Sequence, residues 1–101
     1  MTKIVIYCLD PIKGNRKIEE VANKWQSIDC HMKLIKSYAG YRLIIPSLEQ
    51  EWKVVTASDN ARGIKWDWAW IDENISIQTL HELIYPSGRH HDDYKERVSY
   101  F

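Results

Sequence analysis

Three tryptophans alternate with other residues between Ile64 and Ile71, and this alternation most constrains the fold. Trp66, Trp68 and Trp70 stand two residues apart, which is the period of a β-strand with one buried face. Such a strand places all three indoles on the same face of a sheet. Burying a tryptophan removes about 150–250 Å² from water. A tryptophan-rich core face under a helix is therefore favoured over an exposed aromatic patch, although both remain open.

The residues around these tryptophans are mainly acidic. In the span 64–74, one base, Lys65, accompanies Asp67, Asp72 and Glu73, which gives a local net charge of −2. Single-stranded nucleic-acid platforms place lysine and arginine beside their aromatic rings, so this pattern disfavours them. Indoles beside carboxylates instead suit a cationic protein surface. We therefore predict a partner-binding surface made of Trp66, Asp67, Trp68, Trp70, Asp72 and Glu73.

Length and charge limit the other possibilities. The chain has 101 residues, with 14 basic and 14 acidic side chains and a formal net charge of zero. This length predicts a single globular domain, residues 1–101, with one core. A neutral molecule has no long-range field that steers it to nucleic acid or anionic lipid, so any partner must recognise a local patch.

The first segment, residues 4–9, is apolar and ends at a turn that begins with Asp10. It is too short for a signal peptide or a membrane span, and it predicts a buried first strand. The two cysteines, Cys8 and Cys30, are too few for a disulfide scaffold. We therefore expect reduced thiols, a cytoplasmic location and no membrane partner.

Two helices are predicted. The first follows the turn at residues 10–14, with Asn15 as its cap and apolar side chains at helical spacing as far as Ile28. The second has Ser76 as its cap and covers residues 77–85, because the proline that follows disfavours further helix.

Strands account for most of the remaining chain. Residues 31–46 predict two short strands around Gly40, which permits a tight turn. Residues 51–57 and the tryptophan strand predict a second hairpin around the loop 58–63. The tail, residues 94–101, fits either a last strand or a short helix.

This order of elements predicts an α+β domain with a largely antiparallel sheet and two helices on one face. If the tail is a strand, a ferredoxin-like core with an inserted hairpin is the most economical arrangement. An exposed sheet edge can also pair two copies of the chain, so a homodimer remains open.

Histidine-containing segments give no convincing metal site. His81 and Glu82 begin like a zinc-protease helix, but Tyr85 stands where the second histidine ligand must lie. In the run 90–93, adjacent residues of an extended segment point in alternating directions and do not converge on one ion. The sequence also has no glycine-rich phosphate loop. We therefore expect no metal, no other cofactor and no catalytic residues.

A second candidate site lies where the first strand gives way to the first helix. Asp10, Lys13, Arg16 and Lys17 lie close together in sequence there and suit a phosphate group at a helix N-terminus. The structural alternative is that Asp10 is a turn residue and that the bases are a solvated helix start.

These observations favour a small non-enzymatic cytoplasmic protein that occupies or neutralises a partner protein with a basic surface. Inhibitors, immunity proteins, antitoxins and phage anti-defence factors are of this kind. The hypothesis rests on small size, on five tryptophans and six tyrosines, and on the acid-flanked indoles. The alternative is a nucleic-acid-binding or metal-dependent phosphodiester-acting domain that uses the end of the first strand. A sugar or small-ligand platform on the tryptophan face is a third possibility.

Overall fold

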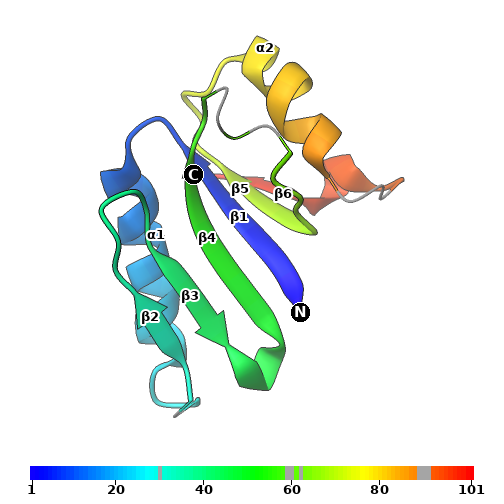
Figure 1. Ribbon diagram of the computed structural model, residues 1–101. Helices are drawn as coiled ribbons and strands as arrows, with labels where there is room; N and C mark the ends of the chain where they lie inside the picture. The colour runs from blue at the N-terminus through cyan, green and yellow to red at the C-terminus, as the bar shows by residue number, and fades with distance from the viewer. Residues whose placement is uncertain (30, 59–60, 62, 89–91) are drawn as a thin grey trace.

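The computed structural model describes residues 1–29, 31–58, 61, 63–88 and 92–101. Its strands form one sheet in the order β2-β3-β4-β1-β5-β6, which Figure 1 shows with helices packed around it. The strand bounds are β1 (Thr2–Cys8), β2 (Lys33–Ile35), β3 (Arg42–Ile45), β4 (Gln50–Thr56), β5 (Trp68–Ile71) and β6 (Val98–Tyr100).

β1 is a central strand and runs parallel to both of its neighbours, β4 and β5. β6 is parallel to β5, whereas β3 is antiparallel to both β2 and β4. The fold is a mixed α+β domain, but the prediction of a largely antiparallel sheet is wrong, because three of these five pairings are parallel. The predicted second hairpin is also wrong, because β1 lies between β4 and β5. Residues 4–8 of β1 are all buried, and strands buried on both faces are typical of parallel sheets.

Helical structure lies in these elements: α1 (Pro11–Trp25), α2 (Ile77–Thr79), a π-helical turn η3 (Leu80–Ile84), and 3-10 turns η1 (Pro46–Leu48), η4 (Tyr85–Ser87) and η5 (Tyr94–Arg97). We call residues 77–87 the second helical segment. α1 begins earlier than predicted because Asp10, not Asn15, is its cap and accepts a hydrogen bond from the Ile12 N–H. The predicted cap Ser76 is confirmed, since its hydroxyl accepts from the backbone N–H of Thr79.

Alternate side chains of β1 enter two different cores. Ile6 packs with Ile18 of α1 in one core, whereas Tyr7 packs with Leu83 and Ile84 of the second helical segment in the other. The two helical segments therefore cover opposite faces of the sheet, and the prediction of two helices on one face is wrong. A ferredoxin-like core is not confirmed, since β1 has a parallel neighbour on each side.

Each helical segment covers only part of its face. α1 contacts β1, β3 and β4. The core of the second helical segment takes in side chains of β1 and β5, and of β4 only Val55 near its end. Figure 1 shows β2, β3 and β4 facing the viewer with no described helix in front of them. The helical segments of the described residues therefore leave an open half-face over β2, β3 and most of β4, on the side of the second helical segment. A second one lies over β5 and β6 on the side of α1.

The tryptophan strand does not continue through its whole predicted length. β5 begins at Trp68, and Trp66 forms only an isolated bridge to Gly88. Between them, the Asp67 carboxylate accepts from the Lys3 N–H at 2.8 Å, and the Asp67 N–H donates to the Lys3 carbonyl at 2.8 Å. Trp66 is fully buried in the core of the second helical segment, whereas Trp70 packs against the core of α1. The prediction that all three indoles share one face is therefore wrong.

Local signals account for the hairpin and the tail. The predicted hairpin of residues 31–46 is confirmed as β2 and β3. Gly40 in its turn has a φ of +146°, and a Cβ there would lie 2.7 Å from the Val54 carbonyl oxygen, so only glycine fits. The tail combines both alternatives, since η5 precedes β6. No helix in the described part of the chain is long and apolar enough to cross a membrane.

Candidate functional site

The predicted partner-binding surface of tryptophans and carboxylates is divided between buried and exposed positions. Trp66 and Asp72 are buried, with exposures of 0% and 3%. Trp68 is 45% exposed, and the Arg97 guanidinium lies 4.9 Å from its ring centroid. The remaining members are Asp67, which is bound to the Lys3 backbone, half-buried Trp70, and exposed Glu73. These six residues do not form one continuous surface.

Asp72 of the predicted partner-binding surface instead pairs with Lys13 of the predicted phosphate site. The Lys13 ammonium donates to the Asp72 carboxylate at 2.9 Å and to the Phe101 carbonyl at 3.1 Å. Burial raises the pKa of Asp72, but the Asn74 N–H and the Lys13 ammonium lower that pKa more, so it lies below its usual value. This ion pair connects α1 to the ends of β5 and β6.

The ion pair predicts a stability that depends on pH. Because the pKa of Asp72 is lower in the folded chain than in the unfolded chain, its contribution is complete above about pH 4 and is lost as the pH falls through the folded value. Asp72→Asn should lower the free energy of unfolding by about 1–2 kcal/mol at pH 7, since Lys13 keeps access to water. Urea unfolding from pH 7 to pH 2 should show the two proteins converging below pH 4. A constant difference across that range would contradict this role.

The predicted phosphate site at the start of α1 does not assemble. Asp10 caps the helix, Lys13 binds Asp72, and the Lys17 ammonium lies 4.0 Å from the Trp70 ring centroid. Arg16 is exposed on the surface of α1. Helical spacing directs these side chains to different neighbours, so the four side chains do not converge on one point where a phosphate could bind.

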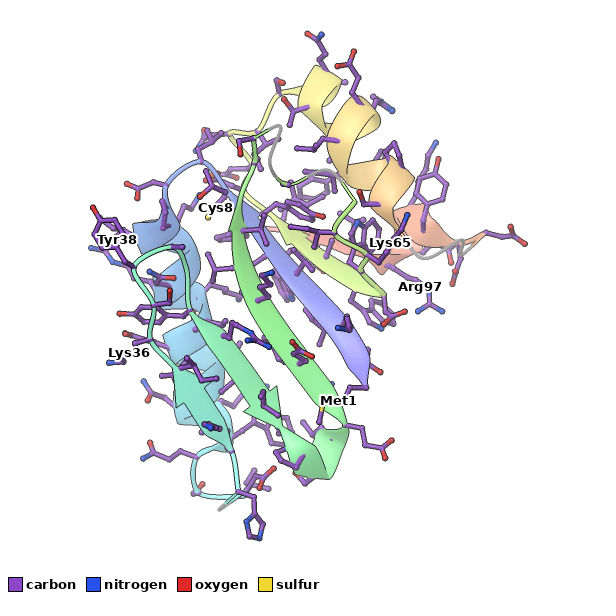
Figure 2. All side chains as sticks on the ribbon, viewed as in Figure 1. Met1, Cys8, Lys36, Tyr38, Lys65 and Arg97 are labelled. Carbon is purple, nitrogen blue, oxygen red and sulfur yellow. The ribbon has the colours of Figure 1, made fainter. Side chains whose placement is uncertain are left out.

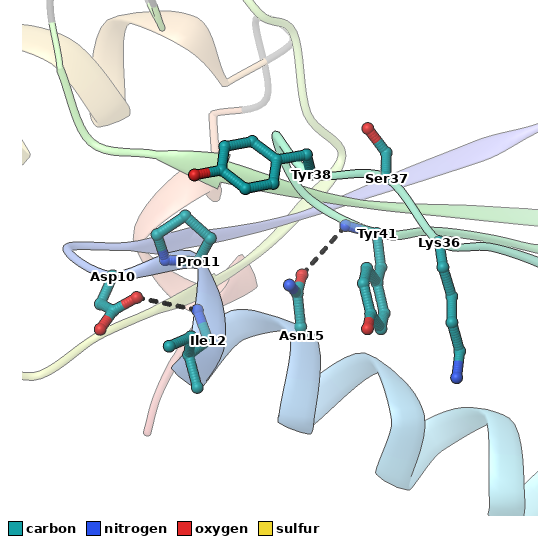
Figure 3. Close-up of a pocket in the computed structure, with 8 residues that line it drawn as sticks. All are labelled: Asp10, Pro11, Ile12, Asn15, Lys36, Ser37, Tyr38 and Tyr41. Carbon is teal, nitrogen blue, oxygen red and sulfur yellow. Dashed lines mark hydrogen bonds between the residues drawn. The ribbon is translucent and has the colours of Figure 1, made fainter.

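A hollow of about 590 Å³ does lie at this end of β1 (Figure 3). Its lining includes Asp10 and Lys36, which Figure 3 shows at opposite ends, and the Lys36 ammonium is 3.7 Å from Glu19. Asn15 is engaged by the backbone N–H of Tyr41. The remaining lining residues are Pro11, Ile12, Ser37 and Tyr38. This hollow therefore has an apolar and aromatic rim and no concentration of positive charge.

A concentration of positive charge among the described residues lies on the open half-face over β2, β3 and β4, and continues to β1 and the loop before β5. Alternation along the strands points these side chains away from α1. We call this surface the basic half-face, and its charged members are Lys3, Lys33, Arg42, Lys53, Lys65 and Glu51. Figure 2 shows it from the front, with Lys65 on the side of β1 away from β4. Among the described residues, five bases against one carboxylate give this surface a net charge of +4.

Glu51 holds only two of these cations. It accepts a hydrogen bond from Arg42 at 2.8 Å and lies 3.7 Å from the Lys3 ammonium. The hydrogen bond from Arg42 lowers the pKa of Glu51, so the carboxylate stays ionised. The three other lysines of this surface form no ion pair with a described carboxylate. Lys53 also stands directly opposite Arg42, a like-charge pairing that destabilises a sheet.

Two connected hollows run across the basic half-face. One, of about 520 Å³, lies beside Lys3 and Lys65, and the other, of about 370 Å³, reaches Thr56. They share Arg42 and Lys53. The basic half-face therefore has a grooved shape as well as a positive charge. Sequence reasoning missed it because its members are spread from position 3 to position 65, and only the strand order brings them together.

Metal and nucleophile chemistry receive little support from the described residues. No group of three or more histidine, cysteine, aspartate or glutamate side chains within that part of the chain is arranged to hold a metal. His90, His91 and Cys30 lie outside the described residues. Burial raises the pKa of the Cys8 thiol to about 11, so it is protonated at neutral pH and a poor nucleophile.

Comparisons of the chain with protein-family models, with curated protein sequences and with solved structures find no match. The geometry and charge of the surfaces described above are therefore the basis for inferring a function.

Proposed function

We propose that this chain is a binding protein that holds the sugar-phosphate backbone of a nucleic acid on the basic half-face. The observation that carries the proposal is the ratio of five bases to one carboxylate, among the described residues, on a sheet face that no described helix covers, in a chain whose net charge is zero. Lysine and arginine on one face are the electrostatic footprint of a phosphate-binding surface. The proposal keeps the nucleic-acid hypothesis, but its binding site is the sheet face and not the start of α1.

The composition of this surface favours a polyanion over a protein partner. Protein interfaces are enriched in aromatic residues and depleted in lysine, whereas four of the five bases here are lysines. None of the described residues that line the two hollows is aromatic. Binding through stacked bases is thus unsupported on this face. The expected binding is through phosphates and independent of base sequence.

Fluorescence anisotropy with labelled DNA strands of two unrelated sequences, each single-stranded and as a duplex, tests the proposal. Each phosphate neutralised contributes about −0.9 to the slope of log K against log salt for B-DNA, so five cations predict a slope of up to about −4.5. The two sequences should bind equally well. Absence of binding at low salt, or binding that does not weaken between low and moderate salt, would remove the proposal.

A second candidate function is the occupation of a partner protein, moved from the tryptophan surface to the hollow of Figure 3. The observation that favours it is a pair of exposed apolar side chains that line the hollow: Ile12 and Tyr38 have exposures of 59% and 104%. Tyrosine is enriched at protein-binding hot spots, and exposed apolar side chains that lie together mark interaction surfaces.

Affinity capture with Tyr38→Asp tests this second function. The wild-type chain should recover one protein in equal amount from a lysate of its source, and Tyr38→Asp should lose it. The matched control is Ile77→Asp, an equally apolar exposed position, 74% exposed, on the second helical segment. Loss in both variants, or in neither, would show that the hollow is not the docking site.

A further inference from the structure

The second open half-face, on the side of α1, contains a groove lined by tryptophans. Trp25 of α1, Trp52 of β4 and Trp70 of β5 converge there around a hollow of about 360 Å³. Trp25 and Trp70 are half-buried, and Trp52 is 8% exposed. The volume lies in the range of small-ligand sites. We call this site the tryptophan groove.

Each accessible ring of the tryptophan groove has a lysine against it. The Lys17 ammonium lies 4.0 Å from the Trp70 ring centroid, and the Lys24 ammonium lies 5.8 Å from the Trp25 ring centroid. Neither ammonium forms an ion pair with a described carboxylate, and Glu20 is the one carboxylate among the described lining residues. In sequence, Trp70 is followed closely by Asp72 and Glu73, but in the folded chain a lysine of α1 lies over its ring.

Rings and cations together indicate the chemistry of the ligand. An apolar ligand alone makes no use of the two ammonium groups, and an anion alone makes no use of the two accessible indoles, Trp25 and Trp70. A planar heterocycle with an adjoining phosphate uses both, by stacking on an indole while its charge meets the lysines. Sugar rings also stack on indoles, but an uncharged sugar leaves the ammonium groups of Lys17 and Lys24 without an anion.

We propose that the tryptophan groove binds a nucleotide, with the base against Trp70 and the phosphate at Lys17 and Lys24. The Lys17 ammonium, which rests on the indole in the free protein, moves to the phosphate and leaves that ring for the base. This site lies on the opposite face from the basic half-face and shares no residue with it. The two proposals therefore fail independently.

Isothermal titration calorimetry with adenosine 5′-monophosphate, adenosine and inorganic phosphate tests the site. The monophosphate should bind with saturation, and adenosine and phosphate alone should each bind at least about tenfold more weakly. Lys17→Gln and Trp70→Leu should each weaken monophosphate binding by roughly fivefold or more, in line with the loss of one charged contact or one stacking surface. Lys17 is partly exposed, so Lys17→Gln should fold normally. This variant tests the site even if Trp70→Leu fails to fold.

Matched controls separate the groove from its neighbours. Trp68→Leu removes the next indole of β5, which does not line the groove, and Lys95→Gln removes an exposed lysine elsewhere, so both should bind the monophosphate as the wild type does. A single-stranded hexanucleotide that binds in the groove at least tenfold more tightly than the monophosphate assigns the site to a strand, and equal affinity assigns it to free nucleotides. No heat at about 5 mM monophosphate, or binding unchanged in both groove variants, would overturn the proposal. Equal affinity for adenosine and its monophosphate would overturn the role of the lysines.

Discussion

Replacing Trp66 with alanine is expected to lower the free energy of unfolding by about 3–5 kcal/mol, the range typical of large buried aromatic side chains. Trp66 is fully buried, and its indole N–H donates to the Ile84 carbonyl at 2.9 Å. The ring also lies against Gly88, where a Cβ would be 3.0 Å from it. Alanine would therefore leave both a cavity and a carbonyl without its donor. A loss of this size is a large part of the total stability of a small domain.

The control comes from the same tryptophan run. Trp68 is 45% exposed and contacts Arg97, so Trp68→Ala should cost about 1 kcal/mol or less. Urea denaturation followed by circular dichroism measures both variants. If Trp68→Ala were as destabilising as Trp66→Ala, the division of the tryptophans between a core and a surface would be wrong.

Features set by neighbouring residues were predictable from the sequence. The buried first strand, the β2 and β3 hairpin and the Ser76 cap each depend on a few adjacent residues. The turn-like composition of residues 10–14 predicts a cap of α1 at Asn15, with Asp10 as a turn residue. Asp10 is followed by proline, which is favoured in the first turn of a helix, and this signal was available in the sequence.

Features set by strand order were not predictable from local patterns. The alternation of Trp66, Trp68 and Trp70 is regular in sequence, but the pairing of Asp67 with Lys3, 64 residues away, interrupts it in space. The neighbours of a strand depend on the whole topology, and an apolar run such as β1 shows only that it is buried. The sequence therefore predicted the type of most elements and not their places in the sheet.

The candidate sites show the same limit. Alternation of Glu51 and Lys53 with buried Trp52 and Val54 already indicated that β4 has one polar face. Whether that face is open depends on which face each helical segment covers, and the sequence pattern had placed both on one face. Likewise, Lys17 and Trp70 lie 53 positions apart in the chain, so the sequence shows Trp70 beside carboxylates rather than beneath an ammonium group.

Neutralising the three lysines of the basic half-face that have no described carboxylate partner should have the largest effect on nucleic-acid binding. Each phosphate contact contributes roughly tenfold to affinity at about 0.05 M salt, so the triple variant Lys33→Gln, Lys53→Gln, Lys65→Gln should bind roughly a thousandfold more weakly. The salt slope should fall from about −4.5 to about −1.8, because only Arg42 and Lys3 remain. Anisotropy titrations over a range of salt concentrations measure both quantities.

A variant with the same change in net charge shows whether the effect is local. Arg16→Gln, Lys36→Gln, Lys95→Gln also removes three positive charges, but from exposed positions away from the basic half-face, and it should keep most of the affinity and the slope. The basic half-face variant should unfold at the same urea concentration as the wild type or a slightly higher one, because it removes the like-charge pair of Arg42 and Lys53. Weaker binding with undiminished stability would show that these lysines serve binding rather than folding. Equal losses of affinity in the two triple variants would instead attribute binding to net charge alone and contradict a site on the sheet.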